Sequence, residues 1–204
     1  MGSNASILLQ KDEVDQISIE TGFTPNQIKR LYNRFTTLDK DNTGYLSKSA
    51  LIRIPELHVN PLRDRIIEVL INDYGTDGKL NFRQFAKVLA TFRRRGTSGA
   101  HHGPGGHDSH HDGEPNSRAN KLRFIFDVYD RDKDNKINKA ELLSILNLLV
   151  GANLPEEQMN AIAERTIAEL GPQSDADPTI SYERFCNTLN KIDVDDKMSM
   201  KFLS

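Results

Sequence analysis

The sequence predicts an all-α protein made of four helix-loop-helix units in two paired lobes. One observation is a pattern that occurs four times: an apolar residue, then a Ser or Asn, then a segment whose apolar residues have helical spacing. The four apolar residues are Leu46, Leu80, Ile137 and Ile180. Because Ser and Asn are good N-caps, each is expected to begin an exit helix. A break in composition at residues 93–117 separates the units two and two. The apolar residues are expected to form short β-bridges between paired loops.

The loop from Asp130 to Glu141 has the clearest chemical pattern, with carboxylates at places one, three, five and twelve of twelve residues. Ca²⁺ takes roughly six to eight oxygen ligands, and the EF-hand loop supplies them at this spacing. The alternative is a charged surface turn, but apolar helices on both sides favour a calcium site. The expected ligands are Asp130, Asp132, Asp134, Lys136 through its backbone oxygen, Asn138 through a water molecule, and Glu141 with two oxygens.

Place six of this loop is Asn135, where Gly is usual because the backbone turns with a positive φ. Asn is among the few residues that tolerate the left-handed region, so the site is expected to be somewhat strained and yet retained. Four basic residues dilute the negative charge and are expected to weaken the affinity. They are Arg131, Lys133, Lys136 and Lys139.

The other three loops lack a full set of ligands. The loop at residues 39–50 ends with Ala50, and the loop at residues 73–84 has Gly75 and Gln84 at places three and twelve. The fourth loop has Arg184 at place twelve, where a positive charge repels a metal ion. Asp175 and Asp177 remain there as candidates for weak metal binding only. We therefore expect one Ca²⁺ site.

Four segments are predicted. Residues 1–22 form an N-terminal segment, residues 23–92 the first lobe, residues 93–117 a linker, and residues 118–204 the second lobe with a tail. The linker is rich in Gly, Pro and polar residues, which predicts flexibility. It holds five of the six histidines. A Zn²⁺, Cu²⁺ or Ni²⁺ site is the alternative to a solvated linker, which we favour because no rigid scaffold fixes the imidazoles.

The chain begins Met-Gly-Ser-Asn-Ala-Ser, and Gly2 followed by Ser6 fits the N-myristoylation pattern. The alternative is a short polar start without modification. One myristoyl chain gives marginal membrane affinity, about 10⁴ M⁻¹, so stable attachment would need a second contact such as a bound partner.

Composition excludes several classes of function. The net charge of −2 gives no reason to expect a nucleic-acid partner. The single Cys186 rules out an internal disulfide framework and is compatible with a reducing cytosol. No nucleophile-base pair or phosphate-binding glycine loop is present, so the chain is not expected to be an enzyme.

Several stretches carry a resemblance to the calcineurin B homologous proteins, a branch of the calcineurin-B-like EF-hand family. They are residues 1–6, 20–23, 53–62 (RIPELHVNPL), 116–122 and 197–203. The resemblance implies a myristoylated protein of the cytoplasm and the cytoplasmic face of the plasma membrane. It also implies a subunit role in Na⁺/H⁺ exchangers, and hence in pH regulation, with a juxtamembrane helix of the exchanger held in a hydrophobic groove. The family usually has two calcium-binding C-terminal hands, and this sequence departs from that pattern in the fourth loop.

The favoured hypothesis is a calcium-dependent module that supports the activity, stability or trafficking of an exchanger. One alternative is a calcineurin-type phosphatase regulator that binds the catalytic subunit or competes for it. Residues 53–62 and the degenerate first and fourth hands are interpreted as arguing against an authentic calcineurin B. Another alternative, a calcium buffer, is disfavoured because only one loop is competent. The candidate groove residues are Phe85, Leu89, Phe92, Phe126, Leu146, Leu149 and Val150.

Overall fold

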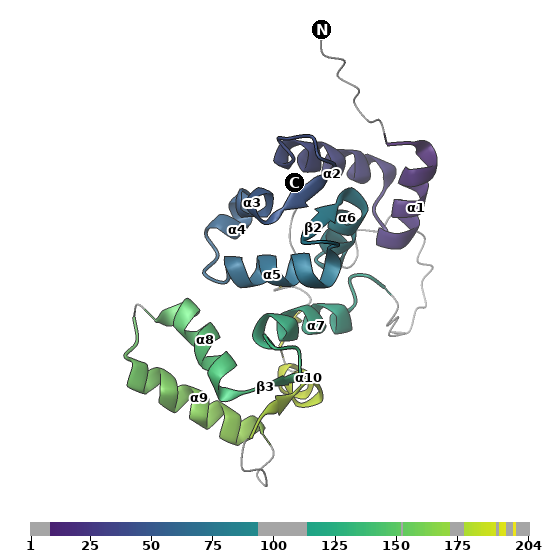
Figure 1. Ribbon diagram of the computed structural model, residues 1–204. Coiled ribbons are helices and arrows are strands. Elements are labelled where there is room, and N and C mark those ends of the chain that lie inside the picture. Colours follow the sequence, from purple (N-terminus) through teal and green to yellow (C-terminus); the bar gives the residue numbers. More distant parts are fainter. Residues whose placement is uncertain are drawn as a thin grey trace, which may run out of the picture.

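The computed structural model describes residues 9–93, 114–151, 153–171, 178–190, 192–194 and 198. These residues form an α-helical protein with four short strands (Figure 1). In chain order the elements are α1 (Lys11–Thr21), α2 (Pro25–Leu38), β1 (Tyr45–Ser47), α3 (Lys48–Ile52), α4 (Pro55–His58), α5 (Arg63–Tyr74), β2 (Lys79–Asn81), α6 (Phe82–Thr91), α7 (Arg118–Tyr129), β3 (Lys136–Ile137), α8 (Lys139–Val150), α9 (Glu156–Leu170), β4 (Ile180–Ser181) and α10 (Tyr182–Leu189).

The strands pair the loops two by two, as the repeat predicted. In the N-terminal lobe β1 is antiparallel to β2, with Leu46 opposite Leu80. In the C-terminal lobe β3 is antiparallel to β4, with Ile137 opposite Ile180. All four apolar residues are buried, so each bridge also contributes to a core. The predicted all-α fold with short β-bridges is confirmed.

Local capping fixes where the helices begin. Thr24 caps α2 and forms a capping box with Gln27, and Pro25 occupies the first turn, where its missing N–H costs nothing. The polar residue at the end of each strand, or directly after it in β3, accepts a backbone N–H three residues later and so begins the exit helix, as predicted. These four caps are Ser47, Asn81, Asn138 and Ser181.

Helix α1 lies in the N-terminal segment, for which the sequence predicted no element. Its apolar residues are sparse, but Val14 and Ile17 are both buried, and α1 packs against α2 and α6. Glu20 forms an ion pair with Arg83 of α6 on the same side. The N-terminal lobe therefore extends back to include α1.

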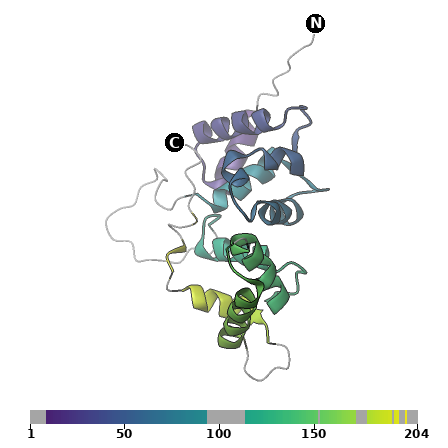
Figure 2. The ribbon, with the colours of Figure 1, turned by 90° about the vertical axis from the view of Figure 1, so that its left-hand side faces the viewer.

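The two lobes share a core instead of standing apart. Phe124, Val128 and Ile145 from the C-terminal lobe belong to the same buried cluster as the N-terminal lobe. The ring of Phe124 meets that of Phe92 edge to face, with centroids 4.9 Å apart. Helix α7 lies at the junction, beside α5, in both views (Figures 1 and 2). A second, smaller core contains Phe126, Ile137, Leu142, Ala163, Ile167 and Ile180.

Some predictions fall outside the described residues. These are Gly2, all five linker histidines, and the pair Asp175 and Asp177. Among the helices that the structure does describe, none combines the length and apolarity that crossing a bilayer requires.

Candidate calcium site

Asp130 stands at the junction of α7 and the loop and is fully buried. Its Oδ2 accepts a hydrogen bond from the backbone N–H of Asn135 at 3.0 Å. Its Oδ1 is buried and accepts none from the part of the chain that the structure describes. Burial raises the pKa of Asp130, and the neighbouring carboxylates of Glu141 and Asp134 raise it further. A buried carboxylate oxygen without a donor is costly unless a cation satisfies it.

Asp132 and Asp134 bring their carboxylates to the same place. One oxygen from each, together with one from Asp130, lies within 4.8 Å of the others. Each side chain also accepts a backbone N–H two residues on, Asp132 from Asp134 and Asp134 from Lys136. Asn135 has φ of 63°, the left-handed conformation expected at place six. The loop thus places three acidic side chains around one point.

Glu141 closes the loop at its other end. Its Oε1 accepts hydrogen bonds from the backbone N–H groups of Arg131 (2.6 Å) and Asp132 (3.3 Å). Its Oε2 accepts one from the N–H of Asn138 at 3.0 Å, and the Asn138 side chain in turn caps Glu141. The carboxylate at place twelve therefore ties the start of the loop to the start of α8.

This set of groups fits Ca²⁺, which prefers carboxylate, carbonyl and amide oxygens. The fit rests on the buried Oδ1 without a donor and on three carboxylates that converge next to a fourth, Glu141. Asp130, Asp132, Asp134 and Glu141 would hold the ion, and the backbone oxygen of Lys136 and a water molecule on Asn138 stay the predicted further ligands. The bound ion would supply the positive charge that offsets the repulsion among these carboxylates.

The structure shows two features that agree with the weak calcium binding expected of the first two loops. In the first, Asp39 accepts N–H groups from Thr43 and Gly44, but place twelve is the buried methyl of Ala50. In the second, a Cβ on Gly75 would lie 2.4 Å from the carbonyl oxygen of Ile71 and 2.7 Å from that of Lys79. A ligand side chain at place three does not fit there.

In the fourth hand, place twelve is a cation and not a carboxylate. Arg184, at place twelve, donates from Nη1 to the carbonyl oxygen of Leu170 at 3.0 Å. That carbonyl is at the end of the incoming helix α9. Place twelve of this hand therefore offers hydrogen-bond donors and no oxygen ligand.

Two apolar cavities lie next to each other, the first lined mainly by the N-terminal lobe and the second by the C-terminal lobe. The first, of 240 Å³, has walls from α3 to α7 that include Leu57, Ile66, Phe85, Phe92 and Phe124. The second, of 200 Å³, lies among α7, α10 and the segment after it, with Ile125, Tyr129 and Phe185 in its wall. Met198 lines both cavities, so they are neighbours on either side of its side chain, and we call the two together the groove.

The predicted groove residues fall into separate places. Phe85, Leu89 and Phe92 line the first cavity, as expected. Phe126 instead belongs to the second core, because its ring packs against Tyr182 and Phe185. The three from α8 line neither cavity: Leu146 packs on the second core, Leu149 is 42% exposed, and Val150 is half-buried.

Phe124 and Met198 are groove residues that were not predicted from the sequence. Phe124 lies on the face of α7 opposite Phe126. Val128, four residues later, lies on the same face as Phe124. That second apolar stripe was the available signal, since a helix with two apolar faces packs on two sides. Nothing in the local sequence around Met198 predicts that its side chain reaches both cavities.

The paired hands and the oxygen-rich loop define a calcium-binding regulatory protein, and comparison with known proteins agrees. Residues 121–151 match the EF-hand domain family. The chain is 37% identical over 201 residues to the calcineurin B subunit of Naegleria gruberi, covering 98% of this chain and 99% of the relative. It is 32% identical over 203 residues to the type 1 calcineurin B subunit of Dictyostelium discoideum, covering 99% of both. The chain belongs to the calcineurin B family of EF-hand proteins.

This membership confirms some of the predictions. It confirms a calcium-binding EF-hand protein that is regulatory and not an enzyme. Relatives named as calcineurin B subunits align over almost the whole chain, including residues 53–62. The interpretation of residues 53–62 from the sequence stays a prediction.

Proposed function

We propose that the chain is the regulatory subunit of a calcineurin-type phosphatase and holds an amphipathic helix of the catalytic subunit in its groove. The observation that supports this most directly is the pair of adjoining apolar cavities that meet at Met198. They lie in a chain whose relatives are named as calcineurin B subunits. An amphipathic helix presents apolar side chains at positions i, i+3, i+4 and i+7, and a long groove with apolar walls accepts such a row.

Helix α7 links the calcium loop to this groove. Phe124 is in the wall of the first cavity, and Ile125 and Tyr129 are in the wall of the second. The next residue, Asp130, is the first of the loop. Calcium bound there would fix the end of α7. A fixed α7 would hold its side chains in place in the walls of both cavities. The role that we propose for calcium is to hold the groove ready for a partner helix.

Co-purification with a calcineurin catalytic subunit, followed by a phosphatase assay, tests the proposal. Ile66→Asp places a charge in the first cavity and is expected to weaken complex formation at least about tenfold, because an unpaired charge in an apolar interface is costly. Val59→Asp is the matched control, since Val59 is 82% exposed and lies outside both cavities. Normal assembly of the Ile66 variant, or no assembly of the wild type in saturating calcium, would contradict the proposal.

A second candidate partner is the juxtamembrane helix of a Na⁺/H⁺ exchanger. The observation that favours it is the resemblance of residues 53–62 and 116–122 to the calcineurin B homologous proteins. The same groove would serve, because an amphipathic helix is recognised by the spacing of its apolar residues. Pull-down with each helix separately, in saturating calcium, discriminates between the two partners. The names of the relatives support the phosphatase as the first candidate.

We further propose that Gly2 is N-myristoylated and that the acyl chain, together with a bound partner, brings the protein to the cytoplasmic face of the plasma membrane. The support is the Gly2 and Ser6 pattern and the marginal affinity of a single acyl chain. Intact mass of the protein expressed with an N-myristoyltransferase, beside Gly2→Ala as control, tests acylation. Identical masses for the acylation product and the unmodified chain would contradict it.

A further inference from the structure

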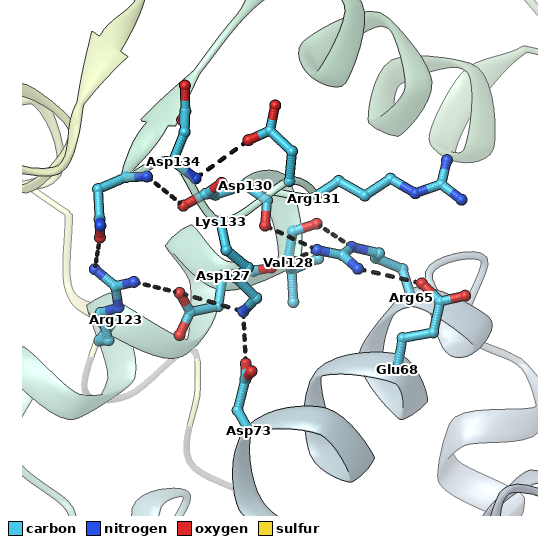
Figure 3. A network of polar contacts seen from close by, with 12 residues as sticks. Arg65, Glu68, Asp73, Arg123, Asp127, Val128, Asp130, Arg131, Lys133 and Asp134 are labelled. Atoms are coloured by element: carbon cyan, nitrogen blue, oxygen red, sulfur yellow. Dashed lines mark hydrogen bonds and ion pairs between the residues drawn. The ribbon is translucent and has the colours of Figure 1, made fainter. Parts of the chain in front are cut away.

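Arg65 of α5 reaches from the N-terminal lobe to the start of the calcium loop (Figure 3). Its Nε donates to the carbonyl oxygen of Val128 at 2.9 Å. Its Nη2 donates to the carbonyl oxygens of Asp127 (2.8 Å) and Asp130 (3.0 Å). Glu68, one turn along α5, holds the guanidinium from behind at 3.2 Å. The Arg65 side chain is only 10% exposed, so these bonds are largely shielded from water.

These bonds coincide with the point where α7 stops. In a continuing α-helix, the N–H groups of residues 131 and 132 would donate to the carbonyls of residues 127 and 128. Both N–H groups donate to Oε1 of Glu141 instead. The two carbonyls that are left over are the ones that Arg65 satisfies. Glu141 thus accepts the N–H groups, and Arg65 donates to the carbonyl oxygens, that would pair with each other if α7 continued.

A second contact joins the same loop to the N-terminal lobe. Lys133, at place four, donates from Nζ to Oδ2 of Asp73 at 2.7 Å. Asp73 is the first residue of the second loop. The same ammonium lies 3.7 Å from Asp127, whose carboxylate also pairs with Arg123. Figure 3 shows Asp73 and Arg65 approaching the loop from α5.

We propose that Arg65 is a positioning residue for calcium binding and that the calcium affinity of the Asp130–Glu141 loop is set from the other lobe. Without Arg65, three carbonyl oxygens at the end of α7 lose their donor. The cheapest recovery is to extend α7 by a turn, which pairs the N–H groups of residues 131 and 132 with two of those carbonyls. That turn would take Glu141 off its anchor and Asp130 out of the loop conformation, so calcium would have to unwind it.

Coupling of this kind acts in both directions. If contact with α5 raises calcium affinity, bound calcium must strengthen the contact between α5 and α7 by the same factor. Both helices contribute to the wall of the first cavity, through Ile66 and Phe124. The inference rests on calcium binding at this loop, which is part of the proposed function, and does not depend on which partner occupies the groove.

The test is calorimetric calcium titration of the full chain with Arg65→Gln and Arg65→Lys. Arg65→Gln is expected to raise the calcium Kd about 5- to 30-fold, within the range typical of coupling between sites, with the stoichiometry unchanged. Arg65→Lys keeps the charge but not the fork of donors, so an intermediate increase is expected. Arg63→Gln is the matched control, because it makes the same charge change on the same helix and Arg63 pairs only with the exposed Asp64 among the described side chains.

The sign of the effect separates positioning from simple electrostatics. Removing a positive charge near a cation site should strengthen calcium binding by Coulomb's law, whereas loss of positioning weakens it. A calcium Kd that Arg65→Gln lowers or leaves unchanged would overturn the proposal. If the same variant also has a lower unfolding midpoint in chelator, Arg65 is a purely structural contact. Equal weakening by Arg63→Gln would also overturn it. If Arg65→Gln does not fold, Arg65→Lys decides by the same criteria. Absence of calcium binding in the wild type would overturn both this inference and the calcium site.

Discussion

Replacing Glu141 by Gln separates the two roles of this side chain. In the structure its carboxylate accepts three backbone N–H groups, from Arg131, Asp132 and Asn138. A Gln keeps one acceptor oxygen, but its NH₂ group then faces a backbone N–H. Both groups are donors, so that hydrogen bond is lost. The change therefore alters the loop even before calcium is added.

The expected magnitude follows from those contacts. Loss of one hydrogen bond to a charged group costs about 1.5–3 kcal/mol. Part of this is offset, because removing the negative charge relieves its repulsion with Asp130. A net destabilisation of about 1–2 kcal/mol remains, and in a chain of this size each kcal/mol lowers the Tm by roughly 2–4 °C. For calcium binding the loss is larger, at least about 100-fold, since the closing ligand loses its charge and one of its two oxygens.

Calorimetry on the full chain measures the calcium effect, and thermal unfolding in chelator measures the effect without calcium. The wild type is expected to bind one calcium ion. Glu141→Gln is expected to abolish that binding or to raise its Kd at least about 100-fold. Glu183→Gln is the matched control, because Glu183 is also in the first turn of an exit helix but is exposed. A Kd for Glu141→Gln within threefold of the wild type would refute the assignment of this loop. A wild-type stoichiometry of two would show that one of the other three loops also binds calcium.

Three further outcomes are expected. Hydrogen bonding to Arg83 lowers the pKa of Glu20 from 4.5 to about 2. The stability from this surface pair, up to about 1 kcal/mol, is therefore present above pH 4.5 and lost as the pH falls toward 2. Arg83→Gln should be less stable than the wild type above pH 4.5 and equally stable near pH 2, and acid-unfolding curves identical to those of the wild type would contradict this. Phe124→Ala should cost about 3–5 kcal/mol in one cooperative transition, because Phe124 is in the shared core; denaturant unfolding with two separate transitions would instead show independent lobes. Ala50→Glu supplies the missing acid of the first loop, and calorimetry should then give two calcium ions per chain in place of one; an unchanged stoichiometry would show that place twelve is not what this loop lacks.

The sequence determined the features that depend on nearby residues. The acidic spacing of Asp130 to Glu141, the positive φ of Asn135 and the four helix caps all come from local chemistry, so one chain was enough to predict them. The pairing of Leu46 with Leu80 and of Ile137 with Ile180 followed from their repeat in the sequence. The start of α2 followed from Thr24 and Pro25 in the same way.

Only the tertiary structure decided how the lobes meet and which apolar residues face a groove. Phe126 and Phe124 are two residues apart on α7, yet one is buried in the second core and the other lines a cavity, because the helix packs on two sides. Arg65 lies 62 to 65 residues from the carbonyls it binds, and no local pattern encodes contacts over that separation. The loop can be recognised from its own twelve residues, but the groups that hold it in place come from the other lobe.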